Sequence, residues 1–352
     1  MTHAHPEPGP TEWLKGDGPI ADIVMSSRVR LARNIAGIPF VSRATAGDRT
    51  HILEIAQRAI TDGHLPQEVR WIDLANADEL GRHLLVERHL ISSQHAKSSG
   101  ARAVAISTPD ERLSIMVNEE DHFRIQFVRS GFCLGDAFDS VNDIDDRLEE
   151  SLDYAFSSKF GYLTACPTNV GTGLRLSVML HLPALKITGD IEKAKRAAKA
   201  MSLAVRGFYG EGSEAVGDFF QISNQTTLGK TERDILARFN ENIIPQIIEY
   251  ERVARKSLLE KRSVMLEDRV FRAFGTLRSA RLLKADEALE LLSHARLGVA
   301  LGVIKDVPIE TVNRLVLISQ PAHLQQHVGR SLTQAERRVE RATVARELLG
   351  GS

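Results

Sequence analysis

The fold of this chain is decided by the stretch from Val117 to Phe127, which reads V-N-E-E-D-H-F-R-I-Q-F. After Asp121, large apolar residues alternate with polar ones, and this period of two predicts a strand with one face in the core. The polar face would then carry Glu120, His122, Arg124 and Gln126. On one strand, Glu120 and Arg124 would lie roughly 13 Å apart at about 3.3 Å per residue. Solvated strands also show alternating charges, so a functional interpretation depends on what other segments contribute.

The 352-residue chain has an ordinary globular composition, with 43% hydrophobic and 26% charged residues. This length allows two domains, or one large domain with an extension. Because 45 Lys and Arg residues are balanced by 46 Asp and Glu residues, the net charge is near zero. That balance argues against a nucleic-acid-binding surface. A site for anions must come from local clustering of cations.

The first 20 residues are rich in Pro, Gly and charge, which predicts a flexible start without the apolar run of a signal peptide. The sequence also lacks the roughly 18 consecutive apolar residues of a membrane span. The two cysteines, Cys133 and Cys166, are too few for a disulfide framework or a cysteine-based zinc site. These features predict a cytoplasmic protein with no metal site of its own and no nucleic-acid or membrane partner.

Two further segments place arginines on one face of a strand. If residues 23–34 are extended, Arg28 and Arg30 point to the same side, where they repel each other until an anion bridges them. In residues 174–180, leucine and valine fill one face and leave Arg175, Ser177 and Met179 on the other. An exposed pair of strand arginines is the alternative interpretation for Arg28 and Arg30.

The remaining pattern predicts an α+β fold, an antiparallel sheet flanked by helices, followed by an all-helical region. Further strands are predicted at 69–74, 101–107 and 113–117, and helices at 51–60, 78–90, 137–156, 190–203, 247–261, 265–282, 285–301, 308–319 and 334–349. Pro245 is expected to kink or break the first helix after Thr231. We therefore divide the chain into a flexible start (1–20), a catalytic domain (21–254) and a helical dimerisation or regulatory domain (255–352).

A glycine-rich loop is predicted around residues 207–217. It carries Arg206, Glu211 and Glu214, and long polar loops of this kind inside a compact domain are more often functional than mere connections. The turn at 169–173 contains two glycines that allow close approach to a ligand. Neither a P-loop nor the kinase-type glycine-rich loop with H-R-D and D-F-G occurs in the sequence.

The predicted strands and loop together supply one cation cluster and two carboxylates. The five arginines are Arg28, Arg30, Arg124, Arg175 and Arg206. A triphosphate with magnesium needs about this many cations, because phosphoryl transfer depends on positioning and charge stabilisation. Glu120 and Glu214 would suit a guanidinium acceptor, which stays protonated until carboxylates orient it and help to remove a proton.

Four motifs, S-S-R-V-R, N-E-E-D-H-F-R, C-P-T-N-V-G-T-G-L-R and R-G-F-Y-G-E-G-S-E, resemble those of the guanidino (phosphagen) kinases. Nearly the whole chain resembles the bacterial protein arginine kinases of McsB type. The resemblance implies a catalytic fold shared in outline with glutamine synthetase, and transfer of the ATP γ-phosphate to protein arginines with Mg²⁺. It also implies that the product marks proteins for a Clp-type protease. The chain lacks the helical domain that precedes the catalytic unit in small-molecule phosphagen kinases.

The resemblance also implies a role for each matching residue. Implied nucleotide contacts are Ser26, Ser27, Arg28, Val29, Arg30, His89, Arg124, Arg175, Leu176, Ser177, Val178, Met179, Arg206, Gly207, Phe208, Tyr209, Gly210 and Glu211. Implied catalytic residues are Glu120 as general base, Glu214 as the second carboxylate on the guanidinium, and Cys166 beside it. His89 matches loosely, and an ordinary helix histidine is its alternative. Tyr209 replaces an arginine of small-molecule phosphagen kinases, a change that bacterial protein kinases share.

The last predicted helix begins at a capping box formed by Thr333 and Glu336, which places Arg337 and Arg341 on one helix face. The resemblance implies that an R-D-x-x-R-A motif here binds phosphoarginine. In this chain the motif consists of Arg337, Arg338, Val339, Glu340, Arg341 and Ala342. Because Arg338 replaces the carboxylate, we expect weak binding of phosphoarginine. A solvated charged helix is the alternative.

The resemblance predicts a protein arginine kinase. The alternatives are a kinase for free arginine or a similar small guanidine, and a non-catalytic adaptor that binds nucleotide or phosphoarginine. The implied partners are proteins with accessible arginines, an activator protein, a Clp-type protease downstream and a second copy of the chain.

Overall fold

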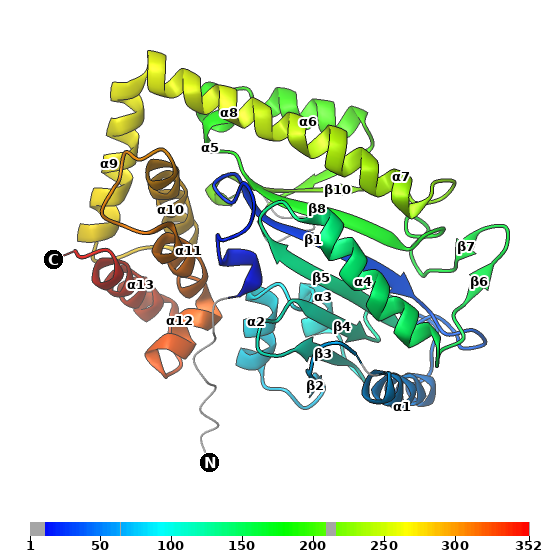
Figure 1. Ribbon diagram of the computed structural model, residues 1–352. Coiled ribbons are helices and arrows are strands. Elements are labelled where there is room, and N and C mark those ends of the chain that lie inside the picture. Colours follow the sequence, from blue (N-terminus) through cyan, green and yellow to red (C-terminus); the bar gives the residue numbers. More distant parts are fainter. Residues whose placement is uncertain (1–10, 64, 209–215, 352) are drawn as a thin grey trace.

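The computed structural model describes residues 11–63, 65–208 and 216–351. At its centre is an eight-stranded sheet in the order β2-β3-β4-β5-β1-β8-β10-β9, with antiparallel neighbours (Figure 1). These strands are β1 (Val24–Arg33), β2 (Val69–Asp73), β3 (Ala103–Ser107), β4 (Leu113–Val117), β5 (Phe123–Ser130), β8 (Leu174–His181), β9 (Leu203–Arg206) and β10 (Phe219–Asn224). A separate hairpin joins β6 (Phe156–Ser157) to β7 (Gly161–Tyr162). The predicted antiparallel sheet is confirmed.

One face of the sheet is apolar and covered by helices. Val29 and Leu31 on β1 lie beside Leu176 on β8 and Ile125 on β5, and all four side chains are buried. The helices α1 (Ala46–Asp62) and α4 (Leu134–Glu149) pack on this face (Figure 1). This packing follows from the period-two pattern, because every second residue of a strand points to the same side.

The opposite face is divided into an apolar part and a basic part. Over β3 and β4, it is covered by α2 (Glu79–Glu87) and α3 (Ser93–Lys97). The apolar cluster there consists of Leu74, Leu85, Leu90, Ile91, Ala96, Val104, Ile106 and Met116. Further along the same face, β5, β1 and β8 carry arginines in place of apolar residues. Helices therefore seal one end of the face and leave the basic end for a polar ligand.

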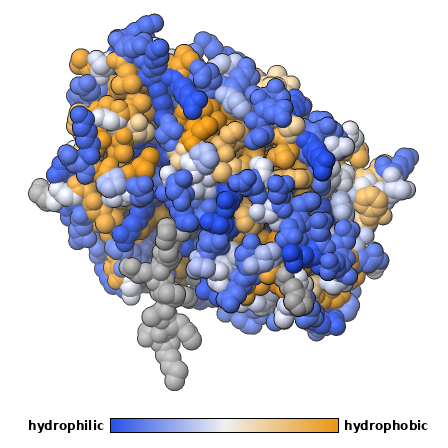
Figure 2. All heavy atoms as spheres, in the orientation of Figure 1, coloured by the Kyte–Doolittle hydropathy of each residue, from blue (hydrophilic) through white to orange (hydrophobic). Residues whose placement is uncertain are grey.

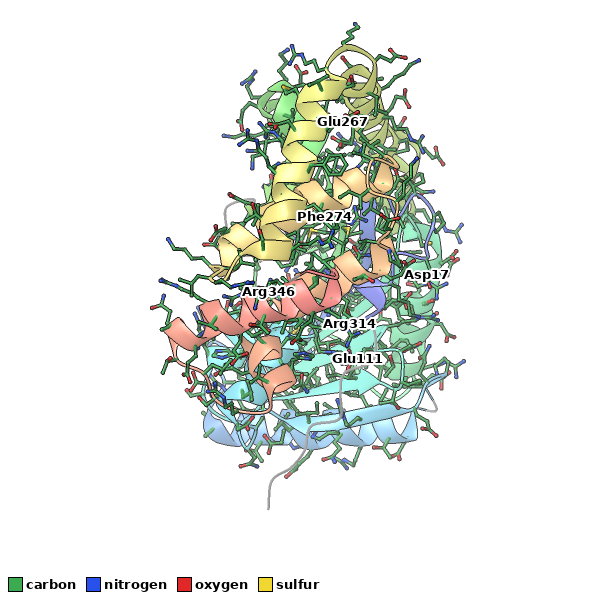
Figure 3. All side chains as sticks on the ribbon, turned by 90° about the vertical axis from the view of Figure 1, so that its left-hand side faces the viewer. Asp17, Glu111, Glu267, Phe274, Arg314 and Arg346 are labelled. Atoms are coloured by element: carbon green, nitrogen blue, oxygen red, sulfur yellow. The ribbon has the colours of Figure 1, made fainter. Side chains whose placement is uncertain are left out.

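The helical region packs against one end of the sheet (Figure 1). Its elements are α8 (Ile244–Lys261), α9 (Ser263–Ser279), α10 (Ala285–Ala300), α11 (Ile309–Ile318), α12 (Pro321–Val328) and α13 (Gln334–Leu348); α5 (Pro183–Thr188), α6 (Ile191–Ala200) and α7 (Glu232–Ala237) precede them. Figure 3 shows α9, with Glu267 and Phe274, standing over α13 with Arg346. The boundary predicted at 255 lies inside α8, so one helix leads from the sheet into the helical region.

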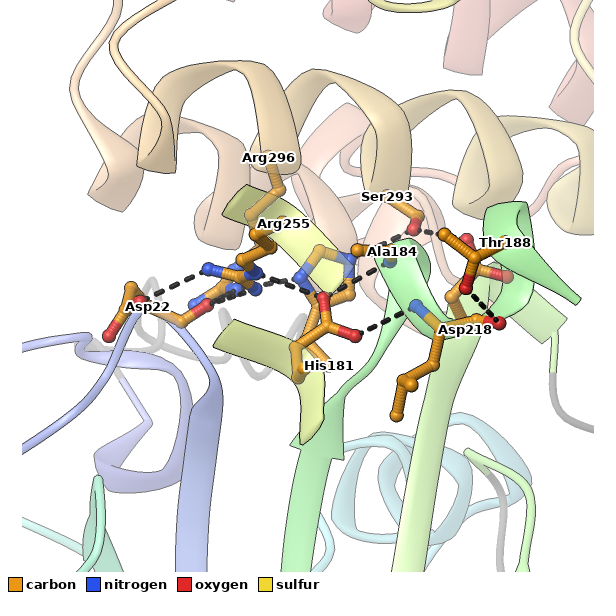
Figure 4. Close-up of polar contacts among 10 residues, drawn as sticks. Asp22, His181, Ala184, Thr188, Asp218, Arg255, Ser293 and Arg296 are labelled. Carbon is orange, nitrogen blue, oxygen red and sulfur yellow. Dashed lines mark hydrogen bonds and ion pairs between the residues drawn. The ribbon is translucent and has the colours of Figure 1, made fainter. Parts of the chain in front are cut away.

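A buried chain of hydrogen bonds joins α10 to the sheet (Figure 4). Arg296 donates from Nη1 to His181 Nδ1 at 2.9 Å, and His181 Nε2 lies 2.9 Å from Ser293 Oγ. The Ser293 hydroxyl then donates to Asp218 Oδ2 at 2.8 Å. Burial lowers the pKa of His181 well below its ordinary value, and Arg296 adds to this effect. A neutral His181 fits this directional chain, which fixes the helical region to the ends of β8 and β10.

Several elements differ from the sequence-based expectations. The start predicted as flexible contains a buried 3-10 helix, η1 (Glu12–Leu14), because Trp13 packs into the molecule. The helix expected at 137–156 ends at Glu149, and α12 was not predicted. A π-helical segment, Arg238–Ile243, directly precedes α8, whose second residue is Pro245. Among the described residues, no helix is long and apolar enough to span a bilayer.

Candidate active site

Five predicted arginines share the basic face of the sheet. Arg30 on β1 lies opposite Arg175 on β8, and Arg28 lies two residues earlier on β1. Arg124 follows on β5 and Arg206 on β9, in registers that direct both to this same face. Directly opposite residues of antiparallel strands point to one side, so the five guanidinium groups form a basic surface. The structure thus brings the five predicted arginines together on one face.

The electrostatics of this surface favour a polyanion. Burial, followed by repulsion from Arg175, Arg124 and Arg206, lowers the pKa of Arg28 to about 10. Burial and the same kind of repulsion, chiefly from Arg124, also hold the pKa of Arg30 well below its ordinary value. Crowding of cations is costly unless an anion is shared among them, and guanidinium groups bind phosphate oxygens in pairs. The residues present therefore fit a polyphosphate.

Neutral side chains hold two of the arginines in place. Gln221 accepts a hydrogen bond from Arg28 Nη2 at 2.9 Å, and Ser223 accepts one from Arg175 Nη2 at 3.0 Å. Both partners lie on β10, and sequence reasoning missed them because nothing but their place on a strand marks them. They orient the guanidinium groups without neutralising them.

A small pocket beside Arg28 contains His89. Its lining residues are Trp13, Ser26, Arg28, His89, Val128, Met179 and Gln221. The His89 ring lies 4.5 Å from the Trp13 ring and 5.7 Å from the Phe208 ring, centroid to centroid. Burial, followed by Arg28, lowers the pKa of His89 to about 3, so the imidazole is neutral at physiological pH. Because α2 ends at Glu87, His89 lies beyond the helix, and the alternative interpretation of His89 as an ordinary helix histidine is wrong.

The residues between β4 and β5 form a turn, so the single strand predicted for the decisive stretch is wrong there. Asn118 has a positive φ of 61° and donates from Nδ2 to the carbonyl oxygens of Arg49 and Ala101, at 2.8 and 2.9 Å. The turn folds Glu120 back over β5, where its Oε2 lies 2.9 Å from Arg124 Nη2. The separation of roughly 13 Å expected for a continuous strand is therefore wrong.

Glu120 and its neighbour Glu119 have different environments. Burial raises the pKa of Glu120, and Asp121 and Glu119 raise it further against the opposing effect of Arg124. Burial alone would also raise the pKa of Glu119, but Arg124 and Ser92 outweigh it, and the pKa is lowered. Glu119 thus stays ionised and anchors Arg124 Nη1 at 2.5 Å. Glu120 is better suited to accept a proton.

Cys166 lies on a loop attached to this turn. Asp121 Oδ1 accepts hydrogen bonds from Ala165 N and from Asn34 Nδ2, both at 2.7 Å. Asp121, next to Glu120, is therefore hydrogen-bonded directly to Ala165, next to Cys166. Cys166 itself is partly exposed, with Sγ 3.0 Å from Thr168 Oγ1. The structure thus brings the Cys166 loop next to the Glu120 turn, and the place of Cys166 beside a substrate guanidinium stays a prediction.

Several other residues implied as nucleotide contacts do not present their side chains on the basic face. The side chains of Ser27, Val29, Leu176 and Val178 point to the apolar face, so only their backbone atoms are available on the basic face. Gly207 and Phe208 are buried, and the Phe208 ring packs 5.4 Å from Phe219. Tyr209, Gly210, Glu211 and Glu214 lie outside the described residues.

Comparisons with known proteins agree with this geometry. Residues 51–254 match the family model of the ATP:guanido phosphotransferase C-terminal catalytic domain, and residues 263–351 match that of the protein-arginine kinase McsB C-terminal domain. This chain belongs to the ATP:guanido phosphotransferase family. Within that family it is similar to the protein-arginine kinase of Symbiobacterium thermophilum, with 48% identity over 342 residues and 96% of each chain covered. It is 44% identical to the protein-arginine kinase of Bacillus subtilis over 341 residues, or 96% of this chain and 93% of that one.

Solved structures of guanidino kinases share the fold. The duplicated taurocyamine kinase of Schistosoma mansoni superimposes with a TM-score of 0.60 at 26% identity, covering 67% of this chain and 34% of that longer one. A lombricine kinase superimposes with a TM-score of 0.55 at 25% identity, covering 70% of this chain and 72% of that one. The match supports the catalytic sheet expected for this ATP-dependent phosphotransferase family.

The tail motif of this family member lies on α13. The predicted capping box of Thr333 and Glu336 is confirmed. Arg341 is buried and donates from Nε to the Ser319 carbonyl oxygen at 2.6 Å and from Nη1 to that of Leu283 at 2.9 Å. Arg337 donates to the Leu332 carbonyl oxygen at 3.0 Å. Arg338 is half-buried and Ala342 fully buried. Both phosphate-binding candidates therefore also hold neighbouring backbone in place.

Proposed function

We propose that this protein is an ATP-dependent protein arginine kinase. The observation that carries the proposal is the row of arginines across β9, β8, β1 and β5, four of them half-buried, that ends at the ion pair between Glu120 and the buried Arg124. A polyphosphate bound along the row would bring its terminal phosphoryl group beside Glu120, the group suited to accept a proton. The relatives named protein-arginine kinase support arginine side chains as the acceptor.

The reaction needs one bond to form and one to break. The terminal guanidinium nitrogen of the substrate attacks the γ-phosphorus of ATP, the bond from phosphorus to the bridging oxygen of ADP breaks, and the nitrogen loses a proton to Glu120. Arg124 is placed to stabilise negative charge on the transferring phosphoryl group, and Glu119 fixes Arg124 there. Contributions of this kind, positioning and charge stabilisation, dominate phosphoryl transfer.

Mg²⁺ is the expected companion of ATP in this site. It would be held by phosphate oxygens and water. When bound, it supplies charge neutralisation for the phosphates. Glu214 as second carboxylate and Cys166 beside the guanidinium remain predictions, as does a cytoplasmic location.

The proposed product, phosphoarginine in a protein, would mark that protein for a Clp-type protease. This part of the proposal, like a possible activator protein, rests on the resemblance to protein arginine kinases. A homodimer through the helical region is supported by exposed apolar side chains along α8 and α9, including Tyr250, Val253, Val264 and Phe271. Figure 2 shows hydrophobic surface interspersed among polar residues on this side of the molecule. Light scattering coupled to gel filtration would measure the oligomeric state.

One experiment distinguishes the proposed function from its two alternatives. The protein is incubated with MgATP and either an unfolded protein or free arginine, and acid-labile phosphate is measured, with phosphoarginine located by mass spectrometry. Protein labelling supports the proposal. Labelling of free arginine alone would favour a small-guanidine kinase, and absence of transfer with intact nucleotide binding would favour an adaptor. Glu120→Gln is the control for contaminating kinases.

A further inference from the structure

His89 stands in an unfavourable backbone conformation that its surroundings maintain. Its φ is +60°, a left-handed value that costs a non-glycine residue free energy and persists where neighbouring contacts hold it. On the sheet side, Gln126 Nε2 donates to the His89 carbonyl oxygen at 2.8 Å. The preceding residue, Arg88, donates from Nε to Glu111 Oε2 at 2.7 Å. These contacts fix one side of the segment.

The other side of the segment is held by the helical region through Glu87. Its Oε1 accepts a hydrogen bond from Ala322 N at 2.8 Å, and its Oε2 accepts from His323 N at 2.9 Å and His323 Nδ1 at 2.7 Å. These N–H groups belong to the first turn of α12, whose own N-cap residue, Gln320, provides no side-chain cap. Glu87 therefore caps a helix that lies more than 200 residues away in sequence, as the separations of 235 and 236 residues show.

This cap is a strong and well-shielded interaction. The side chains of Glu87 and His323 are only 10% and 2% exposed. A carboxylate at a helix N-terminus is favoured by the helix dipole and by charge-assisted hydrogen bonds. Its loss would leave buried N–H groups of α12 without an acceptor. The contact is therefore able to fix the distance between α12 and the segment that carries His89.

A second contact from the helical region reaches His89 through η1. Asn313 on α11 donates from Nδ2 to the Leu14 carbonyl oxygen at 2.9 Å, and Arg296 donates to Asn313 Oδ1 at 3.0 Å. The neighbouring Trp13 ring meets the His89 ring edge to face. The helical region thus holds the backbone of His89 by way of α12 and its ring by way of η1.

We propose that Glu87 is a positioning residue for the nucleotide, because its cap on α12 sets the position of His89 in the pocket beside Arg28. This inference rests on the proposed function, which uses His89 as a nucleotide contact. It assigns the helical region a part in nucleotide binding. It also connects the tail motif to the site, because Arg341 holds the Ser319 carbonyl oxygen three residues before Ala322.

The test is a mutant cycle read by binding rather than by phosphoryl transfer. Titration calorimetry with MgATP is carried out on the wild type, Glu87→Gln, His89→Ala and the double variant. Since a neutral amide cannot replace a carboxylate that accepts three hydrogen bonds, we expect Glu87→Gln to weaken MgATP binding about tenfold, with kcat at saturating MgATP changed less than about twofold. The double variant should bind no more weakly than His89→Ala alone, because the two residues act through one contact.

Unchanged affinity in Glu87→Gln, or weakening that adds to that of His89→Ala, would overturn the inference. Thr231→Ala is the matched control, because it removes the capping box of α7 without touching the His89 segment. If Thr231→Ala weakened MgATP binding as much as Glu87→Gln does, Glu87 would have only a general stabilising role, and the inference would be overturned. If Glu87→Gln does not fold, His323→Ala, which removes the imidazole bond alone, takes its place in the cycle. His323→Gln, whose amide can still donate, should restore binding.

The binding readout separates this inference from the proposed function. A wild type that binds MgATP but phosphorylates no arginine would refute the kinase proposal while leaving the role of Glu87 open to this cycle. Conversely, if the protein phosphorylates arginine but Glu87→Gln leaves its MgATP affinity unchanged, only the positioning role of Glu87 would be refuted.

Discussion

The Glu120 carboxylate and the Arg124 guanidinium are paired at 2.9 Å although the sequence separates them by four residues. The turn from Asn118 to His122 makes this possible by folding the acidic group back over β5. A proton acceptor and a phosphate-binding cation consequently stand side by side at the end of the arginine row. Phosphoryl transfer to a guanidinium requires this proximity, because the acceptor nitrogen must lose its proton next to the transferring group.

Replacement of Glu120 tests its assignment as general base. Glu120→Gln keeps the size of the side chain but removes its basicity, so we expect kcat to fall by roughly two to four orders of magnitude with little change in MgATP affinity. Steady-state kinetics with a protein substrate measure kcat, and calorimetry measures the MgATP affinity. Glu54→Gln, on the exposed surface of α1, is the control. Near wild-type turnover in Glu120→Gln would remove Glu120 from the mechanism.

The pH dependence of the reaction follows from the raised pKa of Glu120. Burial is the main cause of the increase, and Asp121 and Glu119 add to it. Since the base works only when ionised, activity should be lost on acidification at a higher pH than an ordinary glutamate would give. The acidic limb of the kcat/KM profile reports this pKa. The residual activity of Glu120→Gln should lack that limb, and an identical limb in the variant would assign it to another group.

Arg124 differs from Glu120 in that it should serve both binding and rate. Arg124→Ala removes a phosphate-binding cation and leaves the buried Glu119 carboxylate without its partner, so both MgATP affinity and kcat should fall. Folding stability should fall as well, because removal of one partner of a buried ion pair lowers the free energy of unfolding by about 3–5 kcal/mol. Arg129→Ala is the matched control, because Arg129 lies on the same strand with its side chain on the opposite face. Equal effects of the two substitutions would contradict the assignment.

Much of the fold was predictable, because the period-two patterns of β1, β5 and β8 are local signals. These patterns also placed Arg28, Arg30 and Arg175 correctly on one face. The turn at Asn118 was missed because it depends on distant acceptors, the carbonyl oxygens of Arg49 and Ala101. Gln221 and Glu87 were missed for the same reason, since their partners lie about 190 and 235 residues away.

Cys166 should modulate activity without forming a covalent intermediate. Direct transfer to a guanidinium nitrogen requires no phosphorylated enzyme, and Cys166 stands on the loop bonded to the Glu120 turn through Asp121. We therefore expect Cys166→Ser to remain measurably active. Cys133→Ser is the control, because Cys133 lies at the start of α4. Trapping of a phosphocysteine enzyme by mass spectrometry would contradict this expectation.

The tail motif on α13 provides the last prediction. Arg337 and Arg341 are one helical turn apart, and Arg338 occupies the position of the carboxylate that would face a bound guanidinium. A third cation attracts phosphate but repels the positive charge of phosphoarginine, unless Glu336 or Glu340 takes over that pairing. Both carboxylates already lie near Arg330, at 2.6 and 3.4 Å, which disfavours that compensation. The backbone bonds of Arg341 further limit how freely its guanidinium can turn to a ligand.

We therefore expect free phosphoarginine to bind the wild type weakly and to stimulate it poorly, and Arg338→Asp to strengthen both effects. Titration of kinase activity and of binding with phosphoarginine measures them. Arg314→Asp, a charge reversal on α11 outside the motif, is the control for a change in net charge. Strong stimulation of the wild type that disappears in Arg338→Asp would refute the role assigned to Arg338.

The same tail contacts lead to Glu87. Arg341 holds the Ser319 carbonyl oxygen, and Glu87 holds the backbone N–H of Ala322, three residues later. We therefore expect Glu87→Gln to weaken the stimulation by phosphoarginine that Arg338→Asp restores.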